Sequence, residues 1–572
     1  MVCGRGGMNL LCNLISTRLT CANENGRSRF ATARMNSDAT VQISNCLPPR
    51  SHRPLALTLF GVLSLVQLLF LEGHINTPDG QVMFHVNRAI LERGSLAIDP
   101  LPGYRFGGLY VEDQGGKRLY SKFGLGTTLV SLPSMVLGKV LAPLASEAEQ
   151  GIFEDYRHRI DEINAARHPT VPYAREFWYN SSRHNFHEAF LAYFATWANP
   201  IVVAGIGAML FLLGLQFGFG LGPSLLLAVA SNFMTPLWHY AGEFFAEPLS
   251  ALSSLVFLWC CRESLQSRRV RGRLVFLGGL GLGMAVLAKT ANAVLLPWGA
   301  LYGIWTARAH RLAPRSISRW LMCLGTGVAA VLLVSAWYNF VRFGSVLETG
   351  YGNEAGQFNC PFLAGLYGLS FSPGRGILWH HPLILPGLAG GLYFWRKWRA
   401  ETVFIYGVSA TYLAMYSKWH SWEGGWCWGP RFLVGVIPLM LLPAVPVAMA
   451  GWRKGGIFRL LMGGLALFLL MVAYSGVSIN YNVFICWLRD LFDHGRGYFL
   501  ARWGYTSYYD LMRWRWEYSP IAHAFAFPIR QQPILLAAFR YPGIILGINL
   551  AMVGLLVGLL ARLRRLVIDF DR

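Results

Sequence analysis

The sequence predicts an all-α polytopic membrane protein with about 12–13 transmembrane helices. Of its 572 residues, 54% are hydrophobic and only 14% are charged, and apolar runs of membrane-spanning length recur along the chain. Aromatic residues make up 14%, which is typical of chains that cross many membrane–water boundaries. Long polar segments between some of the runs predict outer loops that carry interfacial helices.

The formal net charge of +21 does not indicate a nucleic-acid partner. Most Arg and Lys residues lie in short loops beside apolar runs, where they orient helices in the membrane. The ten cysteines contain no CxxC pair and no metal-ligand spacing, so we expect most of them to be small buried apolar residues. Membrane lipids are therefore the first partners that the composition predicts.

The chain divides into three parts. Residues 1–53 are polar, with seven Arg and no Lys, and lack a signal-peptide apolar region followed by a cleavage site. We expect a disordered basic cytoplasmic lead, with Met35 as an alternative start. Residues 54–450 form the main transmembrane module, with outer loops 73–188 and 339–380. Residues 451–572 add C-terminal spans and the outer loop 486–539.

The apolar runs predict twelve spans, which are oriented by their flanking basic residues. The spans are 54–71, 189–214, 221–237, 244–262, 274–288, 290–306, 319–338, 381–395, 402–416, 432–449, 460–485 and 540–561. Basic clusters at 261–273, 307–319, 396–399, 452–456 and 562–565 are placed inside. The outer side then receives 73–188, 238–243, the tip near Lys289, 339–380, 417–431 and 486–539.

The segment 124–145 does not fit this scheme. It is hydrophobic enough to span, but twelve spans already place both termini inside. It is re-entrant, lies in the interface, or shows that one later helix has been divided wrongly.

The first outer loop places Asp79 just before a helix-like stretch. Val82, Val86, Ala89 and Ile90 fall on one side of that stretch. A carboxylate at a helix N-terminus is electrostatically favourable, so helix capping is one interpretation. The functional interpretation is a general base at the membrane surface.

The same loop then predicts a β-hairpin around the Gln-Gly-Gly-Lys turn at 114–117. This hairpin delivers Tyr120, Ser121 and Lys122 to the start of the ambiguous apolar segment. The Lys122 side chain either snorkels to the interface or holds a phosphate.

At 235–251, the residues His239, Glu243 and Glu247 are spaced i, i+4, i+8 at an outer helix junction. Such a set can bind a metal, but flanking prolines and a missing fourth ligand favour polar lining. A divalent metal is possible but not supported, and we expect no cofactor. Lys289 is a single cation in an apolar hairpin, where it either is functional or paired or snorkels from the tip.

The second long outer loop holds Arg375 between two glycines, which allow a ligand to approach the backbone. His380 and His381 follow at the head of the next span. An Arg beside His suits a phosphate or pyrophosphate, because the guanidinium fork donates several bonds to oxygen. The alternative is an ion pair between Arg375 and either Glu348 or Glu354.

The stretch YSKWHSWEGGWCWGPRFL at 416–433 packs aromatic rings and charges between two apolar runs. Each Trp taken singly is best interpreted as a membrane-belt residue. That interpretation does not explain the glycines, or the charged and polar residues among the rings. The rings are Trp419, Trp422, Trp426 and Trp428, and the polar residues are Lys418, His420, Glu423 and Arg431. The later segment 486–528 is either an interfacial helix or an acceptor surface of aromatics beside cations, and we favour the interfacial helix.

Taken together, these features resemble the GT-C membrane glycosyltransferases. The basic N-terminus, the first span, the early Asp and the amphipathic helix share the family's order. The motifs YSKFGLGTTLVSLPSMVLG, TPLWHY…E and GMAVLAKTANAVLLP resemble the protein mannosyltransferase and aminoarabinose transferase branch, glycosyltransferase family 39, over roughly 54–450. The resemblance implies a GT-C-like fold, a polyprenyl-phosphate-linked sugar donor, and a site facing the periplasm or exterior of a bacterial inner or plasma membrane.

Site residues are carried over by position. Asp79 takes the place of the catalytic carboxylate, and Lys122 that of a donor-phosphate cation. Many relatives have a second acidic residue where this chain has Gly80, which weakens the case for a metal. We assign Arg375, His380, His381, Arg431 and Lys289 to the donor phosphate as well. Sugar and acceptor contacts are assigned to Tyr120, Glu243, His239, Lys418, His420, Trp419 and Trp422.

The resemblance implies a glycosyltransferase that moves the sugar to an acceptor hydroxyl on a protein, lipid or glycan by one inverting displacement. The Trp-rich stretch then becomes a lid over the lipid-linked sugar, with Arg431 near the phosphate. Two other classes remain open. An O-antigen ligase or polysaccharide polymerase would use 339–382 and 486–535, and a multi-span transporter would use Lys289 and Glu243.

Overall fold

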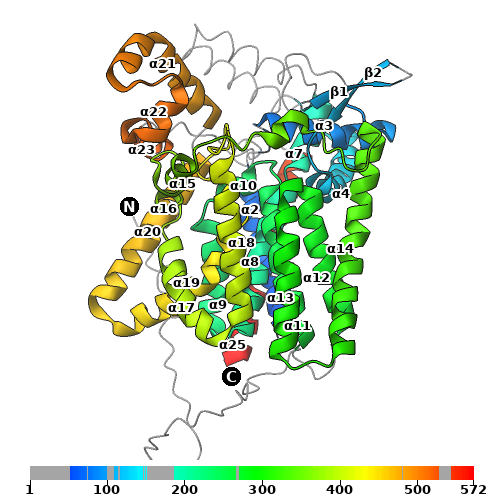
Figure 1. Cartoon of the computed structure of the whole chain (residues 1–572), viewed down its shortest axis with the longest axis vertical. Helices are drawn as coiled ribbons and strands as arrows, with labels where there is room; N and C mark the ends of the chain where they lie inside the picture. Colours follow the sequence, from blue (N-terminus) through cyan, green and yellow to red (C-terminus); the bar gives the residue numbers. More distant parts are fainter. Residues whose placement is uncertain are drawn as a thin grey trace, which may run out of the picture.

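The computed structural model is a long helical bundle with a crown of shorter elements at one end (Figure 1). It describes residues 52–571 except 72, 74, 76, 99–107, 114–115, 146, 148–149, 151–185, 266–269, 479–480 and 527–542. The expected cytoplasmic lead 1–53 lies almost wholly outside the described residues, as does most of 146–185.

The described helices follow the predicted apolar runs closely. The bundle contains α2 (His52–Leu69), α7 (Phe186–Ala195), α8 (Ala198–Gln216), α9 (Leu221–Phe233), α11 (Glu247–Leu265), α12 (Gly272–Ala288), α13 (Leu295–Ala309), α14 (Pro314–Phe343), α17 (Ile384–Lys397), α18 (Arg399–Lys418), α19 (Ile437–Lys454), α20 (Gly456–Ser478) and α25 (Ile544–Asp571). The prediction of an all-α polytopic membrane protein is confirmed.

Shorter elements lie at one end of the bundle or connect its helices. They are α3 (Pro78–Arg93), β1 (Gly108–Asp113), β2 (Gly116–Ser121), α4 (Gly126–Leu141), η1 (Ala142–Leu144), α10 (Leu237–Gly242), η2 (Thr290–Val294), η3 (Gly352–Gly356), α15 (Phe362–Phe371), α16 (Ile377–His380), η4 (Arg431–Leu433), α21 (Tyr481–Trp503), α22 (Tyr508–Trp514), η5 (Trp516–Tyr518) and α23 (Pro520–Ala526). We call the set of α3, β1, β2, α15, α21, α22, α23 and the Trp-rich loop 416–433 the crown.

Six segments among the described residues are long and apolar enough to cross a membrane. They are His52–Leu69, Gly126–Leu144, Phe186–Gln216, Pro314–Phe343, Gly456–Ser478 and Ile544–Phe570. The other predicted spans correspond to helices that are shorter or less apolar. The ambiguous segment 124–145 is among the six by length and composition, and its helix α4 packs against α3 and α7.

Two predicted spans differ from the structure. The run 460–485 is not one helix, because α20 ends at Ser478 and a separate helix, α21, begins at Tyr481. The run 290–306 begins as the 3-10 turn η2 before α13 starts at Leu295. In both places the apolar pattern continues through the break, so hydrophobicity alone does not reveal the change of direction.

The predicted hairpin and the first-loop helix are both confirmed. Strands β1 and β2 pair antiparallel, with Asp113 opposite Gly116 across the turn. Of the four apolar residues predicted on one side of α3, Val82, Val86 and Ala89 are buried and Ile90 is half-buried. The helix begins after Thr77, whose hydroxyl accepts the backbone N–H of Gly80, and ends at Gly94 in the left-handed conformation.

Segments that were predicted to lie on one side of the membrane meet at one end of the bundle. Helix α3 and the hairpin lie on one side of that end and α21 to α23 on the other, whereas the C-terminus of α25 lies at the opposite end of the bundle (Figure 1). Three ion pairs connect the predicted outer loops: Lys122 with Glu354, Asp79 with Arg431, and Glu423 with Arg513. The crown is therefore one connected structure, and it carries the residues considered next.

Candidate active site

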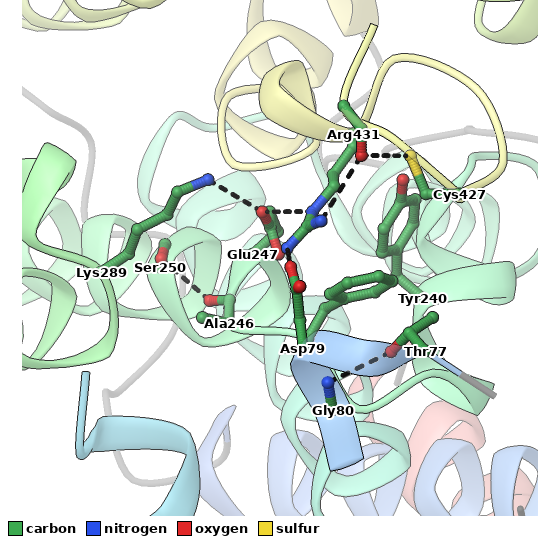
Figure 2. A network of polar contacts seen from close by, with 12 residues as sticks. Thr77, Asp79, Gly80, Tyr240, Ala246, Glu247, Ser250, Lys289, Cys427 and Arg431 are labelled. Atoms are coloured by element: carbon green, nitrogen blue, oxygen red, sulfur yellow. Dashed lines mark hydrogen bonds and ion pairs between the residues drawn. The ribbon is translucent and has the colours of Figure 1, made fainter. Parts of the chain in front are cut away.

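Four charged side chains from four distant segments meet where the crown joins the bundle. Asp79 lies in the first turn of α3, and Glu247 is the first residue of α11. Lys289 lies between α12 and η2, and Arg431 begins η4. Figure 2 shows the Arg431 guanidinium between the two carboxylates, with Lys289 on the far side of Glu247.

The Arg431 guanidinium uses separate nitrogens for the two carboxylates. Its Nη2 lies 2.7 Å from Oδ2 of Asp79, and its Nε lies 3.0 Å from Oε1 of Glu247. Its Nη1 approaches the carbonyl of Gly424 at 3.5 Å, and its face lies 3.9 Å from the ring centroid of Phe245. Because a guanidinium is planar and has donors on several edges, it can hold both carboxylates while stacking on a ring.

The Glu247 carboxylate joins the two cations. Its Oε1 accepts from Lys289 Nζ at 2.9 Å as well as from Arg431, and its side chain is only 4% exposed. Its Oε2 is buried and has no hydrogen-bond partner among the described residues. Lys289 is therefore paired, which agrees with the first of its two predicted interpretations and not with snorkelling. Its Nζ also lies 4.5 Å from the ring centroid of Phe432.

An aromatic pair supports the Lys289 side of the site. Tyr416 and Phe432 stack with centroids 4.2 Å apart and nearly parallel planes, and Lys289 Nζ lies 5.2 Å from the Tyr416 centroid. The hydroxyl of Tyr416 is buried without a partner among the described residues. This wall can therefore offer one hydroxyl, two ring faces and one ammonium to a polar ligand.

The charge of Arg431 is secured by its surroundings. Burial alone would lower its pKa, but the carboxylates of Glu247 and Asp79 raise the pKa well above the ordinary value. The side chain is therefore cationic at neutral pH. The four groups carry two positive and two negative charges, so the cluster is neutral overall.

Buried amides fix the helix ends that present these charges. The amide of Asn199 donates to the backbone carbonyls of Glu243 and Phe245, in the turn that leads into α11. The amide of Asn292 donates to the hydroxyl of Ser250 and to the carbonyl of Ala285, each at 2.7 Å. These bonds satisfy backbone groups exposed at helix breaks, and they tie the start of α11 to the end of α12.

A second ion pair joins the first and the second long outer loops that the sequence predicts. Lys122 Nζ contacts Glu354 at 2.7 Å and lies 5.4 Å from the ring centroid of Tyr351. Burial raises the pKa of Tyr351 to about 12, which Lys289 opposes and Asp79 reinforces. The predicted donor-phosphate role of Lys122 stays a prediction, and in the structure its ammonium is paired with Glu354.

Arg375 does not point into the cluster. It is fully buried, and its guanidinium donates to three backbone carbonyls of the Trp-rich loop, those of Gly425, Cys427 and Gly429. The alternative ion pair is wrong, because Glu354 pairs with Lys122 while Glu348 accepts the N–H of Gly350. A phosphate contact by Arg375 stays a prediction.

His380 and His381 are both buried, and His380 lies against this same loop. His380 Nδ1 contacts the carbonyl of Gly376 at 3.0 Å, and its ring lies edge-on to Trp428 at 5.5 Å. Gly429 has a φ of 64° and lies against the His380 ring, so a Cβ there would come within 2.8 Å of it. His380 therefore contributes to packing around the loop, and the predicted phosphate contacts of both histidines stay predictions.

The predicted helical spacing of His239, Glu243 and Glu247 is wrong. Helix α10 ends at Gly242 and α11 begins at Glu247, so the three residues do not share one helix face. His239 instead contacts the carbonyl of Gly476 at 2.8 Å. Among the described residues, no group of three or more His, Cys, Asp or Glu is placed to hold a metal ion.

Four residues assigned to substrate contacts lie in packed or peripheral positions. Tyr120 is buried on β2, and Lys418 ends α18. His420 is exposed and donates its backbone N–H to Gln357, while Trp419 packs against Phe358 at 5.1 Å. Their contact with a substrate stays a prediction.

The membrane-belt interpretation is wrong for two of the four tryptophans. Trp428 is 0% and Trp422 is 4% exposed, because Trp428 packs between two histidines and Trp422 packs over Gly368. Trp419 and Trp426 are half-buried. The Trp-rich loop is thus a folded wall of the crown.

The sequence matches no family model and no curated protein. Among solved structures, the chain is similar to ArnT from Cupriavidus metallidurans, whose crystal structure has undecaprenyl phosphate bound. The match has 12% sequence identity and a TM-score of 0.42, and it covers 84% of this chain and 78% of that chain. We base the proposed function on the geometry of the charged cluster.

Proposed function

We propose that the protein is a GT-C-type membrane glycosyltransferase that moves a sugar from a polyprenyl-phosphate donor to an acceptor hydroxyl. The observation that carries this proposal is the meeting of Asp79, Arg431 and Lys289 in one cluster. Asp79 and Lys289 lie in segments that resemble the family's motifs, and Arg431 comes from the Trp-rich stretch. The proposed site faces the periplasm or exterior, because the basic loops lie toward the other end of the bundle.

The cluster contains the two kinds of group that this chemistry requires. The acceptor oxygen attacks C1 of the sugar as the bond between C1 and the phosphate oxygen breaks, which inverts the configuration at C1. Asp79 takes the proton from the acceptor hydroxyl. The polyprenyl phosphate leaves with one additional negative charge, which Arg431 and Lys289 stabilise at the moment it develops.

The test is transfer by the purified protein in detergent. Synthetic polyprenyl-phosphate sugars serve as donors and an envelope extract serves as the source of acceptor. We expect Asp79→Asn to lower the transfer rate by roughly 10²–10⁴-fold, the contribution of a positioned base. The matched control is Asp493→Asn, because the Asp493 carboxylate is 57% exposed on α21.

Thermal unfolding and membrane insertion are compared in parallel for both variants. Near-normal transfer by folded Asp79→Asn protein would show that Asp79 is not the base. Failure of the wild-type protein to consume any polyprenyl-phosphate sugar would contradict the proposed function as a whole.

A further inference from the structure

Arg431 holds its two carboxylates in unequal ways. Glu247 is the first residue of α11, its side chain is 4% exposed, and it contacts the inner Nε atom of the guanidinium. Asp79 is 27% exposed and contacts the terminal Nη2 atom. The Glu247 contact is therefore enclosed by protein, whereas the Asp79 contact lies at the more open side of the cluster.

We propose that Arg431 is an exchange point at which the donor phosphate replaces Asp79, while Glu247 is the positioning residue that holds Arg431 and Lys289 in place during the exchange. This inference rests on the proposed function. It assigns a role to Glu247 and an order of events to the site.

The charges of the cluster make such an exchange favourable. With two cations and two carboxylates the site is neutral, so a phosphate that merely adds to it makes the site negative. If the phosphate takes Nη2 from Asp79, it gains a charge-assisted hydrogen bond, and Asp79 can turn toward the more open side. The Nε contact to Glu247 need not change, as Figure 2 shows the two carboxylates on different edges of the guanidinium.

The exchange also changes the chemistry of Asp79. In this structure Oδ2 of Asp79 accepts the hydrogen bond from Nη2 of Arg431 at 2.7 Å, so that oxygen is occupied and cannot receive an acceptor hydroxyl. Once the phosphate has taken the guanidinium, the carboxylate is free to accept a proton from the acceptor hydroxyl. The base therefore becomes active only when the donor is bound, which imposes an order on the reaction: donor first, acceptor second.

Glu247 fits a positioning role and not a catalytic one. One of its oxygens receives both Lys289 and Arg431, at 2.9 and 3.0 Å. Without that shared acceptor, the two cations would repel each other, and neither would have a fixed place. We therefore expect loss of the Glu247 charge to weaken phosphate binding, although the change removes a negative charge from the site.

The experiment compares two variants that each remove one negative charge beside Arg431. Binding of a synthetic polyprenyl phosphate is measured in mixed micelles for wild type, Asp79→Asn and Glu247→Gln. We expect Asp79→Asn to tighten binding by about tenfold, since one charge-assisted bond no longer competes. We expect Glu247→Gln to weaken it by about tenfold or more.

The critical result is that the two variants change the affinity for polyprenyl phosphate in opposite directions. If the carboxylates act only through general electrostatic repulsion of the phosphate, both variants bind more tightly, and the exchange is wrong. If wild type binds no polyprenyl phosphate, the proposed function itself is wrong. Should Glu247→Gln fail to fold, Glu247→Asp keeps the charge but shortens its reach, and it too must bind more weakly if Glu247 positions the cations.

Discussion

At the scale of single residues, the shape of the Arg431 side chain is as important as its charge. A lysine at this position could reach one carboxylate with its single nitrogen but could not hold Glu247 and Asp79 on separate edges. Replacement by alanine would raise the donor concentration needed for transfer, but it would also leave the buried carboxylate of Glu247 without one of its two cationic partners. A lysine substitution therefore tests the geometry with a smaller loss of charge balance.

We predict that Arg431→Lys raises the KM for a polyprenyl-phosphate sugar by about tenfold or more and also lowers kcat, because each lost charged hydrogen bond contributes roughly 1.5–3 kcal/mol. Steady-state kinetics of the purified protein measure both constants. Arg502→Lys on the exposed side of α21 is the matched control. Unchanged kinetics in folded Arg431→Lys protein would show that a single cation suffices.

The sequence identifies three of the four charged residues in the cluster. Asp79 stands out because it precedes an amphipathic helix, Lys289 because it interrupts an apolar hairpin, and Arg431 because it ends a Trp-rich stretch. In the sequence, Glu247 is recognisable only as part of an i, i+4, i+8 triplet with His239 and Glu243. Its significance depends on α10 ending at Gly242 and α11 beginning at Glu247. Gly242 and Pro248 are signals for such a break, and the i, i+4, i+8 interpretation passes over them.

At the scale of elements, the Trp-rich loop is held from two directions. Arg375 donates to three backbone carbonyls of the loop. Glu423 of the loop forms an ion pair with Arg513 of α22 at 2.6 Å. The left-handed glycines Gly424 and Gly425 let the backbone turn so that these carbonyls face inward. The loop that presents Arg431 is thus shaped by residues that do not belong to the charged cluster.

Two roles of Arg375, holding the Trp-rich loop and contacting the donor phosphate, predict different effects of the same substitution. If it holds the loop, Arg375→Lys should lower the unfolding temperature and increase protease cleavage within 420–431, because an ammonium cannot reach all three carbonyls. If it contacts the donor phosphate, the same substitution should weaken donor binding without loosening the loop. We expect the first pattern, with donor KM rising as Arg431 loses its fixed position.

Limited proteolysis and thermal unfolding of the detergent-solubilised variant measure these effects. Arg489→Lys on α21 provides a comparison, since its pair with Asp493 at 3.7 Å lies on an exposed face. A loop that resists protease as well as the wild type does, together with weakened donor binding, would favour the direct phosphate contact.

At the scale of the whole molecule, apolar runs determine the helices but not how distant loops meet. The predicted spans match described helices for most of the chain, because burial in lipid requires long apolar segments with internally satisfied backbones. The contact between Asp79 and Arg431 joins residues 352 positions apart. No local pattern encodes such a pairing, which depends on how α3, α11 and the Trp-rich loop pack together.

The burial of Trp428 has the same origin. A tryptophan between apolar runs is usually found at the interface, yet here the crown encloses the ring between His239 and His380. Loops at the membrane interface and loops packed inside a protein can have the same Trp-rich composition. Only the way the crown packs determines which of the two this loop is.

That enclosure makes stability depend on pH. Burial lowers the pKa of both His239 and His380 to about 4, with partial opposition from a backbone carbonyl and reinforcement from Arg375. In the unfolded chain these groups titrate near 6.5. Between pH 6.5 and 4 the unfolded chain therefore binds protons that the folded protein does not, so the free energy of unfolding falls as the pH falls through this window.

Each histidine accounts for a loss of up to about 3 kcal/mol by pH 4. We predict that the double variant His239→Asn with His380→Asn loses less of its unfolding temperature between pH 7.5 and 4.5 than wild type does, even though it is less stable at pH 7.5. His420→Asn, at an exposed position, should follow the wild-type slope. Parallel slopes for wild type and the double variant would show that these rings remain accessible to protons in the folded protein, and hence that the crown does not enclose Trp428 and its neighbours.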